Sequence, residues 1–117
     1  MRLNEIRYND AVPIDGYGPG FFRIGGKVVE GAVAVFASGV TPWGGFDDTG
    51  TILAQADSLD VLFVGTGAQI AHPPAAFRKL LEDAGIGVET MASPAACRTY
   101  NVLLSEGRRV AVALIPI

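Results

Sequence analysis

Short unbroken runs of apolar residues alternate along this chain with runs at helical spacing, and this alternation predicts its main elements. Val61 to Val64 are four consecutive apolar residues, and Val110 to Ile115 contain no polar residue. Unbroken apolar runs of this length are typical of strands buried on both faces of a sheet. We therefore predict strands at both positions, with another at Ile86–Met91.

A helix is predicted between Pro74 and Gly85. Its apolar positions fall at i, i+3, i+4 and i+7 and are Phe77, Leu80, Leu81 and Ala84. Pro74 suits the first helical turn, where its missing N–H costs nothing, and Gly85 suits the left-handed position that ends a helix. Both ends of this helix are therefore marked.

A second helix is predicted from Ser93 to about Ser105 or Glu106, with Gly107 as its stop. Ser93 is expected to be its N-cap and Pro94 its first helical residue. Its apolar stripe consists of Ala96, Tyr100, Leu103 and Leu104.

The first half of the chain is richer in glycine, and we predict a β-hairpin there. Gly25-Gly26 separates Phe21–Ile24 from Lys27–Val29, and two glycines between β-rich segments are typical of a tight turn. The chain continues past a bend or bulge at Gly31 into an apolar strand at Ala32–Ala37. Further predictions are a short strand near Ile6–Tyr8, a loop at Ser38–Gly45 that ends the strand and carries Trp43, and one or two helical turns between Asp47 and Ser58.

The resulting order is hairpin, β, α, β, α, β. Strands that alternate with helices favour a parallel or mixed sheet covered on its faces. We therefore predict an α/β fold and, from its length, one domain over residues 1–117, in which a βαβαβ half follows an N-terminal hairpin.

Charge and composition exclude several classes of function. Nine Lys and Arg stand against twelve Asp and Glu, a formal net charge of −3, so no nucleic-acid partner is expected. The charged N-terminus predicts no signal peptide, and no uncharged run is long enough to span a membrane. Cys97 is the single cysteine, which fits a cytoplasmic protein. His72 is the single histidine, so the chain cannot supply a cluster of Cys and His ligands, and neither a metal site nor a cofactor is predicted.

The loop after the strand at Val61–Val64 is the first place to look for a site, because ligands in open α/β sheets bind at the carboxyl ends of strands. Gly65-Thr66-Gly67-Ala68-Gln69 begins like a dinucleotide fingerprint, but Ile70 replaces the third glycine and two prolines delay the helix. A phosphate would therefore lack a helix N-terminus. We favour a structural loop, in which Gly65 and Gly67 take positive φ and Thr66 and Gln69 bond loop backbone groups.

Chemistry at the start of the second helix is the alternative. Cys97, beside Arg98, is a candidate nucleophile with His72 as its base, although a small buried apolar residue is the favoured interpretation. Thr99 and Asn101 are predicted to bond neighbouring loops, such as Gly65–Gln69, rather than a ligand. Trp43 is interpreted either as a lid on the core or as an interface anchor.

Several stretches in combination resemble a known family of small domains of unknown function. They are GYGPGFFRIGG, SGVTPWG, DVLFVGTG, AGIGVE and AACRTYNVLLSEGRRVA, and they cover nearly the whole chain in order. The family includes a mitochondrial respiratory complex I assembly factor and an adipogenesis-associated protein. The resemblance implies a three-layer fold with a central mixed sheet and no established enzymatic activity.

The sequence therefore favours a non-enzymatic binding or assembly protein, with a protein partner in respiratory complex assembly as the resemblance implies. The expected surface combines the Gly65–Gln69 loop, Trp43 and Cys97 to Asn101. The alternative is a small-molecule-binding protein or enzyme that uses Cys97, Arg98 and Asn101 near that loop.

Overall fold

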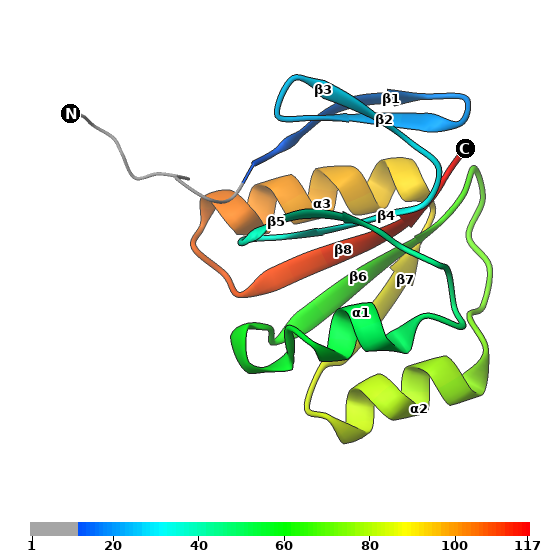
Figure 1. Ribbon diagram of the computed structural model, residues 1–117, viewed down its shortest axis with the longest axis vertical. Coiled ribbons are helices and arrows are strands. Elements are labelled where there is room, and N and C mark those ends of the chain that lie inside the picture. Colours follow the sequence, from blue (N-terminus) through cyan, green and yellow to red (C-terminus); the bar gives the residue numbers. More distant parts are fainter. Residues whose placement is uncertain (1–11) are drawn as a thin grey trace.

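The chain forms two β-sheets and a set of helices, described here by a computed structural model for residues 12–117. Figure 1 shows the arrangement. The elements are β1 (Ile14–Gly18), β2 (Phe21–Ile24), β3 (Lys27–Glu30), β4 (Val33–Phe36), β5 (Gly39–Pro42), α1 (Thr49–Leu53), the 3₁₀-helix η2 (Ala56–Ser58), β6 (Val61–Thr66), α2 (Ala75–Asp83), β7 (Gly87–Met91), α3 (Ser93–Ser105) and β8 (Val110–Ile115). The predicted strand near Ile6–Tyr8 lies outside the described residues.

The central sheet is mixed and has the strand order β5-β4-β8-β6-β7. Strand β6 pairs in parallel with both β7 and β8, as βαβ crossovers require. Strand β4 runs antiparallel to β8 and to β5. The mixed sheet implied by the family resemblance is therefore confirmed, and an all-parallel sheet is excluded.

Helices cover both faces of the central sheet, which gives three layers (Figure 1). On one face, α3 and the three-stranded sheet β1-β2-β3 pack on the first core, formed by Ile14, Phe22, Ile24, Val33, Val35, Phe63, Ala96, Cys97, Tyr100, Leu104, Val110, Val112 and Leu114. On the other face, α1 and α2 pack on the second core, formed by Ala34, Phe36, Trp43, Ile52, Leu59, Leu62, Val64, Phe77, Leu81, Ile86, Val88, Ala111 and Ala113. Alternate residues of β8 enter the two cores, which explains why that strand carries no polar residue.

The predicted hairpin is confirmed. Gly25 and Gly26 have φ of +57° and +81°, the conformation of a two-residue hairpin turn, and Phe22 pairs with Val29 across it. Gly31, with φ of +81°, bends the chain out of this small sheet and into β4 of the central one. One continuous segment thereby contributes to two sheets.

Two local predictions are wrong. Gly39–Pro42 was expected to be loop but forms β5, an edge strand in which Pro42 pairs with Val33. An edge strand has a partner on one side only, so a proline is tolerated there. Ser93 was expected to be an N-cap, but the cap position belongs to Ala92 and the Ser93 side chain makes no capping bond.

Candidate functional site

The end of β6 lies directly against the start of α3, and Gly65 makes this approach possible. A Cβ atom on Gly65 would stand 2.7 Å from Leu114 Cδ2 and 2.8 Å from Ser93 Cα. No side chain fits between the strand and the helix at this point. Of the two loop glycines, only Gly67 has positive φ, +100°, so the sequence interpretation was right for Gly67 and wrong for Gly65.

Ser93 and Gly67 are joined by two hydrogen bonds. The Ser93 backbone N–H donates to the Gly67 carbonyl at 2.7 Å, and the Gly67 N–H donates to Ser93 Oγ at 2.8 Å. The Ser93 hydroxyl in turn donates to the Ile115 carbonyl at 2.7 Å. Ser93 is fully buried, so it ties the ends of β6 and β8 to the first turn of α3. We call this set of contacts between Ser93, Gly67 and Ile115 the joint.

Thr66 orders the rest of the loop. Its hydroxyl donates to the Gln69 carbonyl at 2.8 Å and accepts from the Ala71 N–H at 2.9 Å. The predicted role of Thr66 in bonding loop backbone is thereby confirmed, while Gln69 contributes its carbonyl and its side chain is exposed. Helix α2 begins only at Ala75, so its N-terminus does not directly follow Gly65-Thr66-Gly67, as the two prolines predicted. The helix start that lies against these residues is that of α3.

Cys97 is buried in the first core and is 3% exposed. Burial raises the pKa of its thiol to about 11, with neighbouring Arg98 lowering it only in part. The thiol therefore stays protonated near neutral pH, and the candidate base His72 lies in an exposed loop. The structure contradicts the nucleophile hypothesis and supports the favoured interpretation of Cys97 as a small core residue.

Asn101 uses both ends of its amide on one residue of β1. Its Nδ2 donates to the Ile14 carbonyl at 2.9 Å, and its Oδ1 accepts from the Ile14 N–H at 2.9 Å. The amide thus acts as a backbone mimic that holds β1 against α3. The prediction that Asn101 bonds neighbouring backbone is confirmed, although its partner is Ile14 and not the Gly65–Gln69 loop.

Arg98 is exposed and Thr99 is half-buried on the outer side of α3. With Val102 and Leu103 they line an open depression of about 430 Å³. Residues of the Gly65–Gln69 loop do not line this depression, so the loop and the outer side of α3 do not form one concavity there. A comparable depression of about 450 Å³ lies over the three-stranded sheet, between Phe21, Arg23 and Val28 among others.

Trp43 lies in the second core, on the opposite face of the sheet from α3, and is 4% exposed. Its ring packs at centroid distances of 5.6 Å from Phe46 and 6.0 Å from Phe77, and its Nε1 donates to the Asp48 carbonyl at 3.1 Å. Of the two interpretations, the lid on the core is therefore correct. The interface anchor is wrong, and Trp43 does not share a surface with Cys97.

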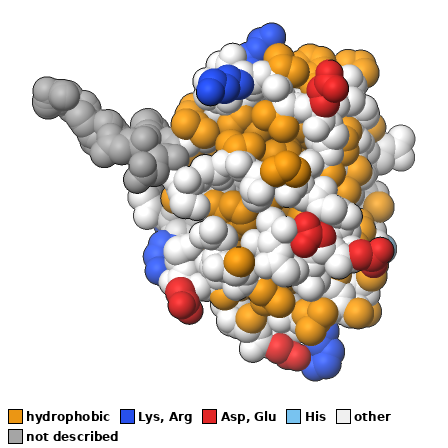
Figure 2. Space-filling model, in the orientation of Figure 1, with side chains coloured by type: hydrophobic (Ala, Val, Ile, Leu, Met, Phe, Trp, Pro, Cys, Tyr) orange, Lys and Arg blue, Asp and Glu red, His pale blue; other side chains and the backbone are white. Residues whose placement is uncertain are grey.

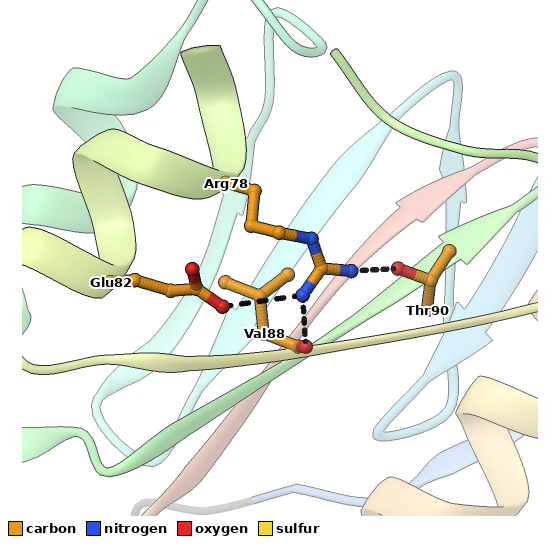
Figure 3. A network of polar contacts seen from close by, with 4 residues as sticks. All are labelled: Arg78, Glu82, Val88 and Thr90. Atoms are coloured by element: carbon orange, nitrogen blue, oxygen red, sulfur yellow. Dashed lines mark hydrogen bonds and ion pairs between the residues drawn. The ribbon is translucent and has the colours of Figure 1, made fainter. Parts of the chain in front are cut away.

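Two residues that organise the molecule were missed in the sequence. Ser93 was assigned only a capping role. Arg78, on α2, reaches the edge strand β7, where its Nη1 donates to the Val88 carbonyl at 2.9 Å and its Nη2 to Thr90 Oγ1 at 3.1 Å, while Glu82 on the same helix pairs with it at 3.3 Å (Figure 3). A charged residue at an outward helical position gave no signal for this contact, which depends on how the helix packs.

No helix among residues 12–117 is long and apolar enough to cross a membrane. In the same part of the chain, no three His, Cys, Asp or Glu side chains gather closely enough to hold a metal ion. On the face shown in Figure 2, acidic and basic side chains lie among largely uncharged surroundings, and some lie next to a side chain of opposite charge.

The fold and the joint define a class: a three-layer α/β domain in which the candidate site residues Thr66 and Asn101 bond the backbone of neighbouring segments. Residues 14–115 match the family described as a protein of unknown function (DUF498/DUF598), and the chain belongs to this family.

Relatives and a solved structure support this assignment. An uncharacterized protein of Rhodobacter capsulatus is 49% identical over 99% of this chain and 94% of its own length. The NADH dehydrogenase [ubiquinone] 1 alpha subcomplex assembly factor 3 of Danio rerio is 36% identical over 88% of this chain. The match spans 63% of the length of that assembly factor. A crystal structure from Bartonella henselae, described as an outer membrane protein, has a TM-score of 0.83 at 35% identity and covers 93% of this chain and 98% of its own.

Proposed function

We propose that this protein is a non-enzymatic binding protein that takes part in the assembly of a respiratory NADH dehydrogenase, and that it acts in the cytoplasm. The observation that carries the proposal is that the candidate catalytic side chains are buried or hydrogen-bonded to backbone. The Asn101 amide bonds the Ile14 backbone through both its nitrogen and its oxygen, and the Cys97 thiol is buried and protonated. These groups hold the fold together and leave no activated nucleophile or base among them.

The relatives give the proposal its direction. Seven vertebrate and insect proteins that are 31–36% identical to this chain carry the name of the NADH dehydrogenase assembly factor. What they share with this chain is the three-layer domain, because the match covers between 88% and 99% of it. A shared domain in relatives named as assembly factors fits a role in holding other proteins.

The experiment that tests the function is affinity capture of the tagged, full-length chain from cells of its own organism. The expected result is co-purification of subunits of the respiratory NADH dehydrogenase, identified by mass spectrometry. Capture of no subunit of that enzyme by the folded wild-type chain would overturn the proposal.

A further inference from the structure

The segment between β6 and α2 presents an exposed surface without charge. From Val61 to Phe77 the chain contains no Asp, Glu, Lys or Arg. Within this stretch the side chains from Ala68 to His72 and from Pro74 to Ala76 are exposed. We call residues 67–76 the Ile70 loop; Figure 1 shows it running along one side of the molecule from the end of β6 to α2. Depletion of charge is the compositional mark of the centre of a protein–protein interface.

Ile70 is the most exposed large apolar side chain in the described part of the chain. It is 66% exposed, against 54% for Val102 and 50% for Leu80. Its surroundings also differ from those of Leu80, which follows Lys79 on α2, and Lys79 forms an ion pair with Asp83. Ile70 is thus an exposed apolar residue with uncharged neighbours in the sequence, whereas Leu80 has charged ones.

The backbone holds Ile70 in place. The Thr66 hydroxyl bonds the Gln69 carbonyl on one side of Ile70 and the Ala71 N–H on the other. Gly67, the first residue of the loop, is fixed to Ser93 by two hydrogen bonds. A side chain presented by a loop that is already ordered binds with a smaller loss of conformational entropy. Exposure and order together are what an interface anchor needs.

We propose that the Ile70 loop is the surface by which this protein binds its partner, and that the partner offers an uncharged apolar pocket that receives Ile70. This inference rests on the proposed function, so the partner is a subunit of the respiratory NADH dehydrogenase. The chain carries a net charge of −3, yet this loop contributes nothing to it. Recognition therefore depends on apolar fit, and binding responds little to salt.

The test compares Ile70→Ser with Leu80→Ser in the capture experiment. Both substitutions remove an exposed branched apolar side chain, and both residues are exposed enough for the fold to be kept, which circular dichroism verifies. Ile70→Ser is expected to lower the captured NADH dehydrogenase subunits by about tenfold or more, because a central anchor dominates binding. Leu80→Ser is expected to capture as much as the wild type, and wild-type capture is expected to persist between about 0.1 M and about 0.5 M salt.

The outcomes separate this inference from the proposed function. If the wild type captures the subunits and Ile70→Ser captures them equally well, the Ile70 loop is not the surface, while the function stands. If Leu80→Ser loses capture as fully as Ile70→Ser, the loss is not specific to the Ile70 loop, and the inference fails. If the wild type captures no subunit, the proposed function and the inference both fail.

Discussion

Ser93 and Gly67 bind each other through two hydrogen bonds, at 2.7 Å and 2.8 Å, although 26 positions separate them in the sequence. One bond uses the Ser93 backbone and the other its side chain, so the pair depends on the identity of the residue in helix α3. The same hydroxyl reaches the Ile115 carbonyl in β8. The loop, the helix and the last strand are therefore fixed at one point.

Ser93→Ala is expected to lower the free energy of unfolding by about 2–3 kcal/mol, because it leaves the buried Gly67 N–H without a partner. Urea unfolding monitored by circular dichroism measures this change. Ser105→Ala is the matched control, since Ser105 is exposed and bonds only the Val102 carbonyl of its own helix. We expect the control to change stability by less than about 0.5 kcal/mol. Equal effects of the two substitutions would contradict the importance of the joint.

Asn101→Ala is expected to destabilise the protein by about 2 kcal/mol, because two hydrogen bonds to the Ile14 backbone are lost. Hydrogen exchange of the β1 amides is expected to accelerate more than that of β8, since the amide holds the small sheet to α3. Arg98→Ala, on the exposed side of the same helix, is the control and should leave both quantities near their wild-type values. Unchanged exchange in β1 after Asn101→Ala would refute this role.

The Cys97 thiol is expected to resist iodoacetamide in the native protein near neutral pH and to react once the chain is unfolded. Burial raises its pKa from 9.0 to about 11, so the thiolate forms more readily in the unfolded chain. The stability contributed by the neutral thiol is thus complete below pH 9 and is lost as the pH rises towards 11. Relative to Cys97→Ala, the wild type should lose about 1 kcal/mol more between about pH 8 and pH 10. Rapid native alkylation would show that the thiol is accessible after all.

Thr66→Val is expected to weaken partner capture between about twofold and tenfold, because the Ile70 loop loses the hydroxyl that orders it. Valine keeps the branched shape of threonine at the end of β6, and a loss of about 1 kcal/mol in stability is expected. The measurement is capture of NADH dehydrogenase subunits at a temperature where both proteins are folded. Wild-type capture by Thr66→Val would show that preorganisation of the loop is not needed.

The central elements of the fold were predictable because burial on both faces leaves a strong pattern. Val110–Ile115 was predicted with the bounds that the structure has, since each residue of β8 enters one of two cores. Strand β5 was missed because Gly39 and Pro42 resemble loop residues. Proline cannot donate a hydrogen bond to a second neighbouring strand, and Pro42, which pairs with Val33, lies on an edge strand where no second neighbour is present. Nothing in the local sequence indicates which strands lie at an edge.

The site was harder to predict because its contacts are distant in sequence. Asn101 and Ile14 are 87 positions apart, and only the packing of α3 against the small sheet brings them together. The sequence did indicate that Asn101 bonds backbone and that the Gly65–Gln69 loop faces the start of that helix. It could not separate the two faces of the sheet, which is why Trp43 was grouped with Cys97.

The proposed role in assembly is tested most directly by the amount of assembled respiratory NADH dehydrogenase in cells that lack this protein. Native gel electrophoresis with in-gel NADH oxidation gives this amount, and re-expression of the wild type and of Ile70→Ser provides the comparison. We expect the assembled enzyme to fall on deletion, to return with the wild type and not to return with Ile70→Ser. Undiminished assembly in the deletion strain would contradict the proposed role in assembly.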